Sequence, residues 1–187
     1  MKRNTLWAAL ALPGMLALAA CSEGAPEATT VNEEAEVGNQ SIAAIIAADD
    51  DLSSIETLLS DAGLAGVFDG NAPYTVLAPT NAAFETLGTD FTGDEARAAQ
   101  VAVLREHIMP GHMALADIQS AIQTEGGPVE METMGDGTLT FSMDGDQLMV
   151  ASTDGGDPVR LVSQMQGVNG VVIPVDGVLK GMPETTS

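Results

Sequence analysis

One short segment holds both histidines and two methionines of this chain, side chains that could bind a transition metal. The two histidines, His107 and His112, lie five residues apart, with Met109 between them and Met113 directly after them. Imidazole and thioether groups are suitable ligands for copper, above all for Cu(I). A copper site formed by these four residues is therefore one hypothesis. The simpler interpretation places Met109 in the core, where methionine fills irregular gaps, and assigns positions 112 and 113 to a turn.

The other polar residues do not form a catalytic pattern. The chain lacks the Gly-x-Ser-x-Gly turn of many serine hydrolases and the Gly-Lys-Ser/Thr of phosphate-binding loops. Asp144 with Asp146, or Asp154 with Asp157, could offer oxygen ligands to calcium, but neither pair follows the twelve-residue loop with its closing glutamate. Asp and Gly are also the residues that hairpin turns require. We therefore expect a protein that is not an enzyme and that needs no cofactor.

The single cysteine, Cys21, ends a segment that is typical of a signal peptide. A basic start is followed by an apolar run that is too short to span a membrane. Residues 18–21 (LAAC) resemble the lipobox of bacterial lipoproteins, in which cleavage precedes the cysteine and acyl chains such as palmitate are added to it. We expect residues 1–20 to be removed and Cys21 to be lipidated. Ser22, where an aspartate would indicate inner-membrane retention, favours the outer membrane if the source is Gram-negative.

The mature chain is strongly acidic. Removal of Lys2 and Arg3 leaves 4 Lys and Arg against 27 Asp and Glu, a formal charge of −23. This charge argues against nucleic-acid binding and against close contact with anionic lipid, and it favours a soluble protein that repels its own copies and stays monomeric. Residues 22–40 carry five glutamates and few apolar residues, so we expect residues 21–40 to be a flexible tether. Its r.m.s. reach would be roughly 25 Å.

Helical patterns dominate the first part of the region that follows. Apolar residues recur at helical spacing from Ile42, after a possible Ser41 cap, and again from Leu52 to Leu59, after Asp49 to Asp51. Ser53 with Glu56, and Thr92 with Glu95, fit capping boxes. Further helices are predicted near residues 64–68, 81–87, 92–106 and 116–122.

Strand patterns dominate the second part. A brief strand is predicted at residues 74–78, and alternating or apolar runs at 129–134, 139–143, 147–151, 159–164 and 170–176 follow, most of them separated by Gly-Asp turns. Helices followed by antiparallel hairpins predict an α+β domain. We place this single domain at residues 41–183, with a tail at 184–187.

Three ordered motifs resemble the signature of fasciclin domains. They are residues 74–84 (YTVLAPTNAAF), 107–111 (HIMPG) and 169–179 (NGVVIPVDGVL). The resemblance implies a β-sandwich or wedge of about seven strands with several helices packed at one side. It also implies adhesion or protein–protein recognition outside the cell, without enzymatic activity. The partner would be a protein or glycan of the envelope, of the matrix or of a neighbouring cell.

The signature residues have a mainly structural interpretation. Pro79 cannot donate a ladder hydrogen bond and should end a strand, and Thr80 can cap the helix that follows. The resemblance implies such roles for Thr75, Ala78, Pro79, Thr80, Asn81, Phe84, His107, Pro110, Gly111, Asn169, Gly170 and Asp176. The residues predicted to be exposed for binding are Gly111, His112 and Met113.

Two positions depart from the family. Glu106 stands where animal adhesion domains often have a tyrosine that is tied to receptor binding, so that role is not expected here. Pro174 stands where the closing motif often has a histidine. Because proline removes a backbone donor, its strand should be an edge or carry a bulge at that point.

Overall fold

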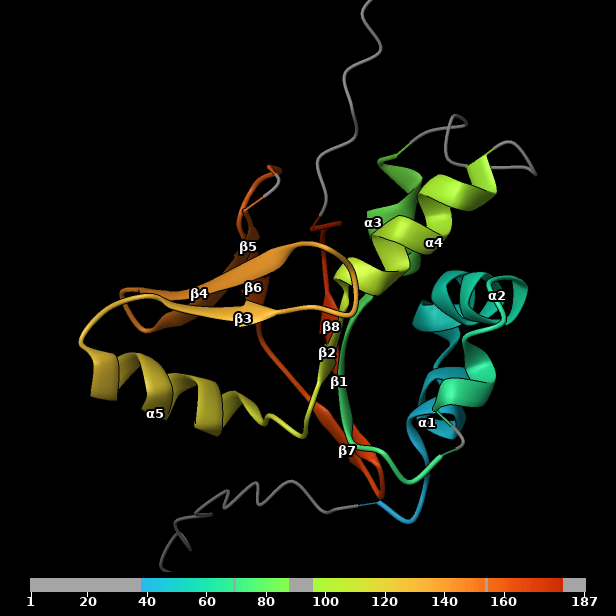
Figure 1. Cartoon of the computed structure of the whole chain (residues 1–187), viewed down its shortest axis with the longest axis horizontal. Helices are drawn as coiled ribbons and strands as arrows, with labels where there is room; N and C mark the ends of the chain where they lie inside the picture. Colours follow the sequence, from blue (N-terminus) through green and yellow to red (C-terminus); the bar gives the residue numbers. More distant parts are fainter. Residues whose placement is uncertain (1–37, 69, 88–95, 154, 180–187) are drawn as a thin grey trace, which may run out of the picture. The chain divides into compact units, whose positions relative to one another are not determined.

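The computed structural model describes residues 38–68, 70–87, 96–153 and 155–179, which all belong to the compact unit Glu33–Ser187. The predicted signal peptide, Cys21, most of the tether and the tail at 184–187 lie outside these residues, as do Thr92, Glu95 and Asp154. The described chain folds into two four-stranded sheets and a set of helices (Figure 1).

The first sheet, called sheet A here, joins segments that are distant in the sequence. It contains β1 (Tyr74–Pro79), β2 (Ile108–Pro110), β7 (Met165–Gly167) and β8 (Gly170–Val175) in the order β2-β1-β8-β7. β1 and β8 run parallel, with Tyr74 opposite Gly170 and Pro79 opposite Val175. The other two pairs are antiparallel. The starts of β1 and β8 and the end of β2 therefore meet at one end of the sheet.

The second sheet, sheet B, is an antiparallel meander. It contains β3 (Val129–Glu132), β4 (Thr138–Asp144), β5 (Gln147–Ser152) and β6 (Val159–Leu161), paired in chain order. Buried residues alternate with exposed ones along β6 and mostly with half-buried ones along β5 and β4, so one face of the sheet packs inward. Gly145, in the turn between β4 and β5, has a φ of 60°, a conformation that glycine adopts without steric cost.

Helices cover both sheets. They are α1 (Ile42–Ala48), α2 (Ser53–Asp61), α3 (Asn81–Glu85), α4 (Arg97–Glu106) and α5 (Leu115–Glu125), with 3-10 turns η1 (Asp50–Leu52) and η2 (Ala65–Val67). Figure 1 shows α1 and α2 on one side of sheet A, and sheet B with α5 on the other.

Sheet A separates two apolar cores. Leu77, Val171 and Ile173 join the core shared with sheet B and α5, whereas Val76, Ala78 and Val172 join the core shared with α1, α2 and η2. Neighbouring residues of β1 and β8 therefore face opposite cores, as the two-residue period of a strand requires. Strands buried on both faces read as continuous apolar runs, which explains the sequences of β1 and β8.

Most of the predicted elements are confirmed, including the caps by Ser41 and Thr80, and Asp49 caps η1. The predicted sandwich of about seven strands is also confirmed. The described residues form eight strands, two of which, β2 and β7 with three residues each, were not predicted from the sequence. The strand of Pro174 is not an edge strand, because β8 lies between β1 and β7, but Pro174 itself lies beyond the last β7 pairing, that of Met165 with Val172.

The capping box predicted for Ser53 and Glu56 is wrong. The N-cap of α2 is Leu52, whose apolar side chain makes no capping hydrogen bond. The amide of Asn81 takes this role from a distant segment, because its Oδ1 accepts from the backbone N–H of Ser54 at 2.9 Å and its Nδ2 donates to the carbonyl of Asp50 at 2.8 Å. A sequence pattern that is local cannot reveal a cap supplied from 27 residues away.

Candidate functional site

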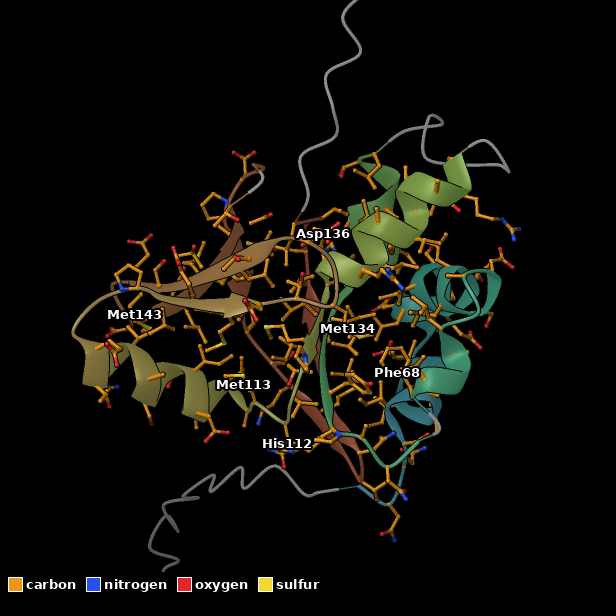
Figure 2. All side chains as sticks on the ribbon, in the orientation of Figure 1. Phe68, His112, Met113, Met134, Asp136 and Met143 are labelled. Carbon is orange, nitrogen blue, oxygen red and sulfur yellow. The ribbon has the colours of Figure 1, made fainter. Side chains whose placement is uncertain are left out.

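The Gly111–Met113 turn is held by one buried hydroxyl. Thr75, fully buried on β1, donates through Oγ1 to the carbonyl of Gly111 at 2.9 Å and accepts from the N–H of Met113 at 2.9 Å. Gly111 has a φ of 104°, and its N–H donates to the carbonyl of Pro73. Both sides of the turn are thus fixed, and His112 remains exposed between them while Met113 is half-buried at the start of α5 (Figure 2).

Asn169 joins three segments at the same end of sheet A. Its Oδ1 accepts from the N–H of Ile42 at 2.8 Å, and its Nδ2 donates to the carbonyls of Phe68 and Gly70. Gly170, with a φ of 149°, follows it. A Cβ at Gly170 would lie 1.9 Å from the carbonyl oxygen of Tyr74, so the close approach of β1 and β8 requires glycine here.

His107 lies in the core, and both of its ring nitrogens are engaged. Nδ1 is 2.8 Å from the carbonyl oxygen of Val103, and Nε2 accepts from the backbone N–H of Leu179 at 3.0 Å. A carbonyl can only accept and an N–H can only donate, so the ring is neutral with its proton on Nδ1. Burial lowers the pKa of His107 from 6.5 to about 4, partly offset by the hydrogen bond to Val103.

Glu106, next in the chain, points inward as well. It is 2 % exposed, and its carboxylate accepts from the hydroxyl of Thr133 at 2.9 Å and from the N–H groups of Asp136 and Gly137 at 3.1 Å each. A Cβ at Gly135 would lie 2.1 Å from Oε1 of this carboxylate. The last turn of α4 therefore holds the loop between β3 and β4, and the family's receptor-binding position is not at the surface of this chain.

The remaining signature residues are mostly used within the fold. Ala78 and Pro79 are buried at the end of β1, Thr80 caps α3 through the N–H of Ala83 at 3.3 Å, and Phe84 packs against the helical core. Pro110 and Asp176 are exposed. The structure therefore brings Thr75, Gly111, Asn169 and Gly170 together at one end of sheet A and leaves Asp176 at the other.

The copper hypothesis does not fit this geometry. Both nitrogens of His107 hold backbone hydrogen bonds, and Met109 is 1 % exposed in the core shared with sheet B. Only His112 and Met113 of the four are accessible. No group of three or more His, Cys, Asp or Glu within the described ranges could hold a metal ion. In the part of the chain that the structure describes, no helix has the length and apolar character needed to cross a bilayer.

Sequence reasoning missed two features of this region. It did not place Glu106 in the interior, because a carboxylate before an apolar run is typical of an exposed helix end. It did not single out Val168, whose side chain is 63 % exposed in the turn between β7 and β8. The run of uncharged residues around Val168 was a visible signal, although the strand order was needed to interpret it.

Comparison with known proteins assigns the fold. The sequence model of the fasciclin domain family matches residues 50–183 of this chain. A solved structure of a domain pair from the insect cell adhesion molecule fasciclin I superposes with a TM-score of 0.56 at 24 % sequence identity, over 73 % of this chain and 47 % of that one. The chain thus spans about half the length of that structure. At this identity the likeness establishes the fold alone.

Proposed function

Because the chain belongs to the fasciclin domain family, we propose that it is an envelope lipoprotein whose single domain of this family binds a protein or glycan and performs no catalysis. The family match over residues 50–183 carries the proposal. The insect molecule of similar fold is described as a cell adhesion molecule, which supports a role in recognition.

The arrangement of the signature residues supports a binding module. Thr75, Asn169 and His107 make hydrogen bonds inside the fold, so they position loops and do not offer reactive groups to a substrate. The loop residue His112 is exposed on a turn fixed at both sides. Rigid display of a loop is the usual way in which a scaffold presents binding residues. Gly111, His112 and Met113 thus remain the proposed contact residues.

The anchor rests on the sequence. The lipobox-like residues 18–21 and the absence of any other cysteine support export and lipidation at Cys21, with residues 22–37 as the connection to the domain. The outer membrane remains the proposed location if the source is Gram-negative. A Cys21→Ser variant should move from the membrane fraction to the soluble fraction or stay uncleaved. Mature-sized Cys21→Ser protein that stays in the membrane fraction would show that the lipobox interpretation is wrong.

Crosslinking in cells tests the binding role. The full-length lipoprotein is crosslinked in its native envelope and the adducts are identified by mass spectrometry, with Cys21→Ser protein as the control. We expect one partner to be enriched with the anchored form, with crosslinked peptides near His112. A His112→Ala, Met113→Ala variant should lose that partner and keep its fold. Equal recovery of abundant envelope proteins by all variants would contradict a specific binding module.

A further inference from the structure

One end of sheet A is formed by segments without charged side chains. These segments are residues 38–40, 70–73, 110–113 and 167–170, here called the neutral end, and none of these residues is Asp, Glu, Lys or Arg. Backbone hydrogen bonds join them: the N–H of Gly38 donates to Gln166, that of Val168 to Gln40, that of Tyr74 to Asn169 and that of Gly111 to Pro73. These bonds place the four segments next to one another at this end of the sheet.

Some of the acidic residues lie far from the neutral end, and others border it. Asp176 and Glu85 are exposed near the opposite end of sheet A, and the hairpin loops of sheet B carry Asp136, Asp144 and Asp146. Other carboxylates border the neutral end. One oxygen of Asp117 accepts from the N–H of Ala114 at 3.0 Å, Asp49 to Asp51 line a surface hollow with Gly38 and Gln166, and Asp69 precedes residues 70–73 in the sequence. In a mature chain of charge −23, so many uncharged residues at one end are unexpected.

The chain reaches the neutral end from the proposed anchor. Gly38 is fixed there by its 3.0 Å hydrogen bond to the carbonyl of Gln166. Residues 22–37 are the segment between Cys21 and this attachment. The neutral end is thus the part of the domain closest along the chain to the lipidated residue. A short tether raises the effective concentration of this end at the membrane, so even a weak contact with lipid would be populated.

We propose that the neutral end is the face of the domain that rests on the lipid surface, an inference that depends on the anchoring proposed above. Because the proposed contact residues Gly111 to Met113 belong to this end, their partner would then be a component of the same envelope at the membrane surface. Val168 is 63 % exposed, and Ala72, Pro73 and Pro110 are exposed in the other segments of the neutral end. Small apolar groups gain free energy when they enter the interfacial layer of a bilayer. An acidic face would be repelled by anionic headgroups, so the charge distribution also orients the domain with its acidic loops away from the membrane.

A single tryptophan can test this orientation. The only tryptophan of the chain, Trp7, lies in the predicted signal peptide, so the mature protein has none. Val168→Trp and Ala72→Trp place a reporter at the neutral end, and Met143→Trp places one on β4, in the other sheet, where the native side chain is 38 % exposed. Each lipidated variant is reconstituted into phosphatidylcholine–phosphatidylglycerol vesicles with or without brominated acyl chains.

We expect bromolipids to quench the emission at positions 168 and 72 several-fold more strongly than the emission at position 143, together with a blue shift at the first two. Adding Val168→Asp to the Ala72→Trp protein should reduce that quenching, because a carboxylate at the contact opposes it. Equal quenching at all three positions, or none at 168 and 72, would overturn the inference.

Co-sedimentation separates a failure of the inference from a failure of the anchor. If lipidated wild-type protein does not sediment with vesicles, the anchoring is wrong and the inference falls with it. If it sediments but position 168 is not quenched, the anchoring stands and the neutral end does not face lipid. The control is Cys21→Ser, Val168→Trp protein produced from residue 21 onward, so that it has neither the signal peptide nor Trp7. It should neither sediment nor show quenching, since the contact depends on the lipid anchor.

Discussion

Asn169 connects more of the molecule than any other signature residue described here. Its amide bonds to the N–H of Ile42 and to the carbonyls of Phe68 and Gly70, which belong to segments about 100 residues or more away in the sequence. A buried donor or acceptor that loses its partner costs its full desolvation.

Replacement of Asn169 by alanine should therefore lower the free energy of unfolding by roughly 2–4 kcal/mol. Urea denaturation followed by circular dichroism measures the loss. Asn169→Asp is the matched control, because it keeps an oxygen acceptor for Ile42 and removes the donor to Phe68 and Gly70. Its loss in the free energy of unfolding should differ from that of Asn169→Ala. An unchanged midpoint for Asn169→Ala would show that these contacts contribute nothing to stability.

His107 should make the stability of the domain depend on pH. Its folded pKa of about 4 lies below the ordinary value of 6.5, so between these values the unfolded chain binds more protons than the folded chain. The stabilisation is present above pH 6.5 and is lost as the pH falls toward 4. The free energy of unfolding should fall by about 1.4 kcal/mol per pH unit within this window.

The measurement is urea unfolding between pH 7 and 5, a range in which ordinary carboxylates remain ionised. His107→Asn should flatten the dependence, although it also lowers stability by removing the bond to Leu179. His112→Asn, which changes the exposed histidine, should retain the slope of the wild type. A wild-type stability independent of pH over this range would contradict the neutral, buried state assigned to His107.

At the scale of elements, the carboxylate of Glu106 links α4 to the loop between β3 and β4. Glu106→Ala would leave the N–H groups of Asp136 and Gly137 without this acceptor, and we expect a loss of roughly 2–4 kcal/mol. Hydrogen exchange at these two amides should be faster in Glu106→Ala than in the wild type, under conditions in which the domain as a whole stays folded. Arg105→Ala, at an exposed neighbouring position, is the control and should change neither quantity much. Slow exchange in Glu106→Ala would exclude the proposed link.

The parallel contact between β1 and β8 depends on the absence of a side chain at Gly170. Gly170→Ala would drive a methyl group into the carbonyl of Tyr74 and the side chain of Ile42, and it would also strain a φ of 149°. We expect destabilisation of more than roughly 3 kcal/mol or failure to fold, which thermal unfolding would reveal. Gly63→Ala is the comparison, because its φ of 69° is strained but its Cβ would meet no atom within 4 Å. Similar losses for both variants would show that crowding at β1–β8 is unimportant.

Local patterns predicted elements that carry their own signals. The stripe Leu52, Ile55 and Leu59 and the alternation of β4 and β5 follow from periodicity alone. Strands β2 and β7 escaped because three residues are too few to show a period, and they exist through pairing with β1 and β8. The cap of α2 escaped because Asn81 supplies it through tertiary structure.

At the scale of the whole molecule, the fold could be predicted because three ordered motifs resembled a family, whereas the surface could not. His107 and Met109 looked like ligands in sequence, but their environment depends on which face of β2 and α4 meets a core. The neutral end comprises four segments separated by tens of residues, so it becomes visible only once the strand order of sheet A brings them together.

The acidic charge of the mature chain should weaken the fold at low ionic strength. The mature chain has a charge of −23, and its basic residues in the described ranges are Arg97, Arg105 and Arg160. Folding brings the carboxylates closer together than they are in the unfolded chain, so they repel one another more strongly in the folded state. Salt screens this repulsion, since the Debye length falls from about 30 Å at 0.01 M to about 8 Å at 0.15 M. The urea midpoint should therefore rise between these concentrations, with sodium and choline chloride acting alike because the effect is screening.

Asp144→Asn with Asp146→Asn should reduce the salt dependence of the urea midpoint without a large change at high salt, because both residues are exposed in one hairpin. A midpoint that falls with added salt would mean that favourable ion pairs outweigh the repulsion among the carboxylates.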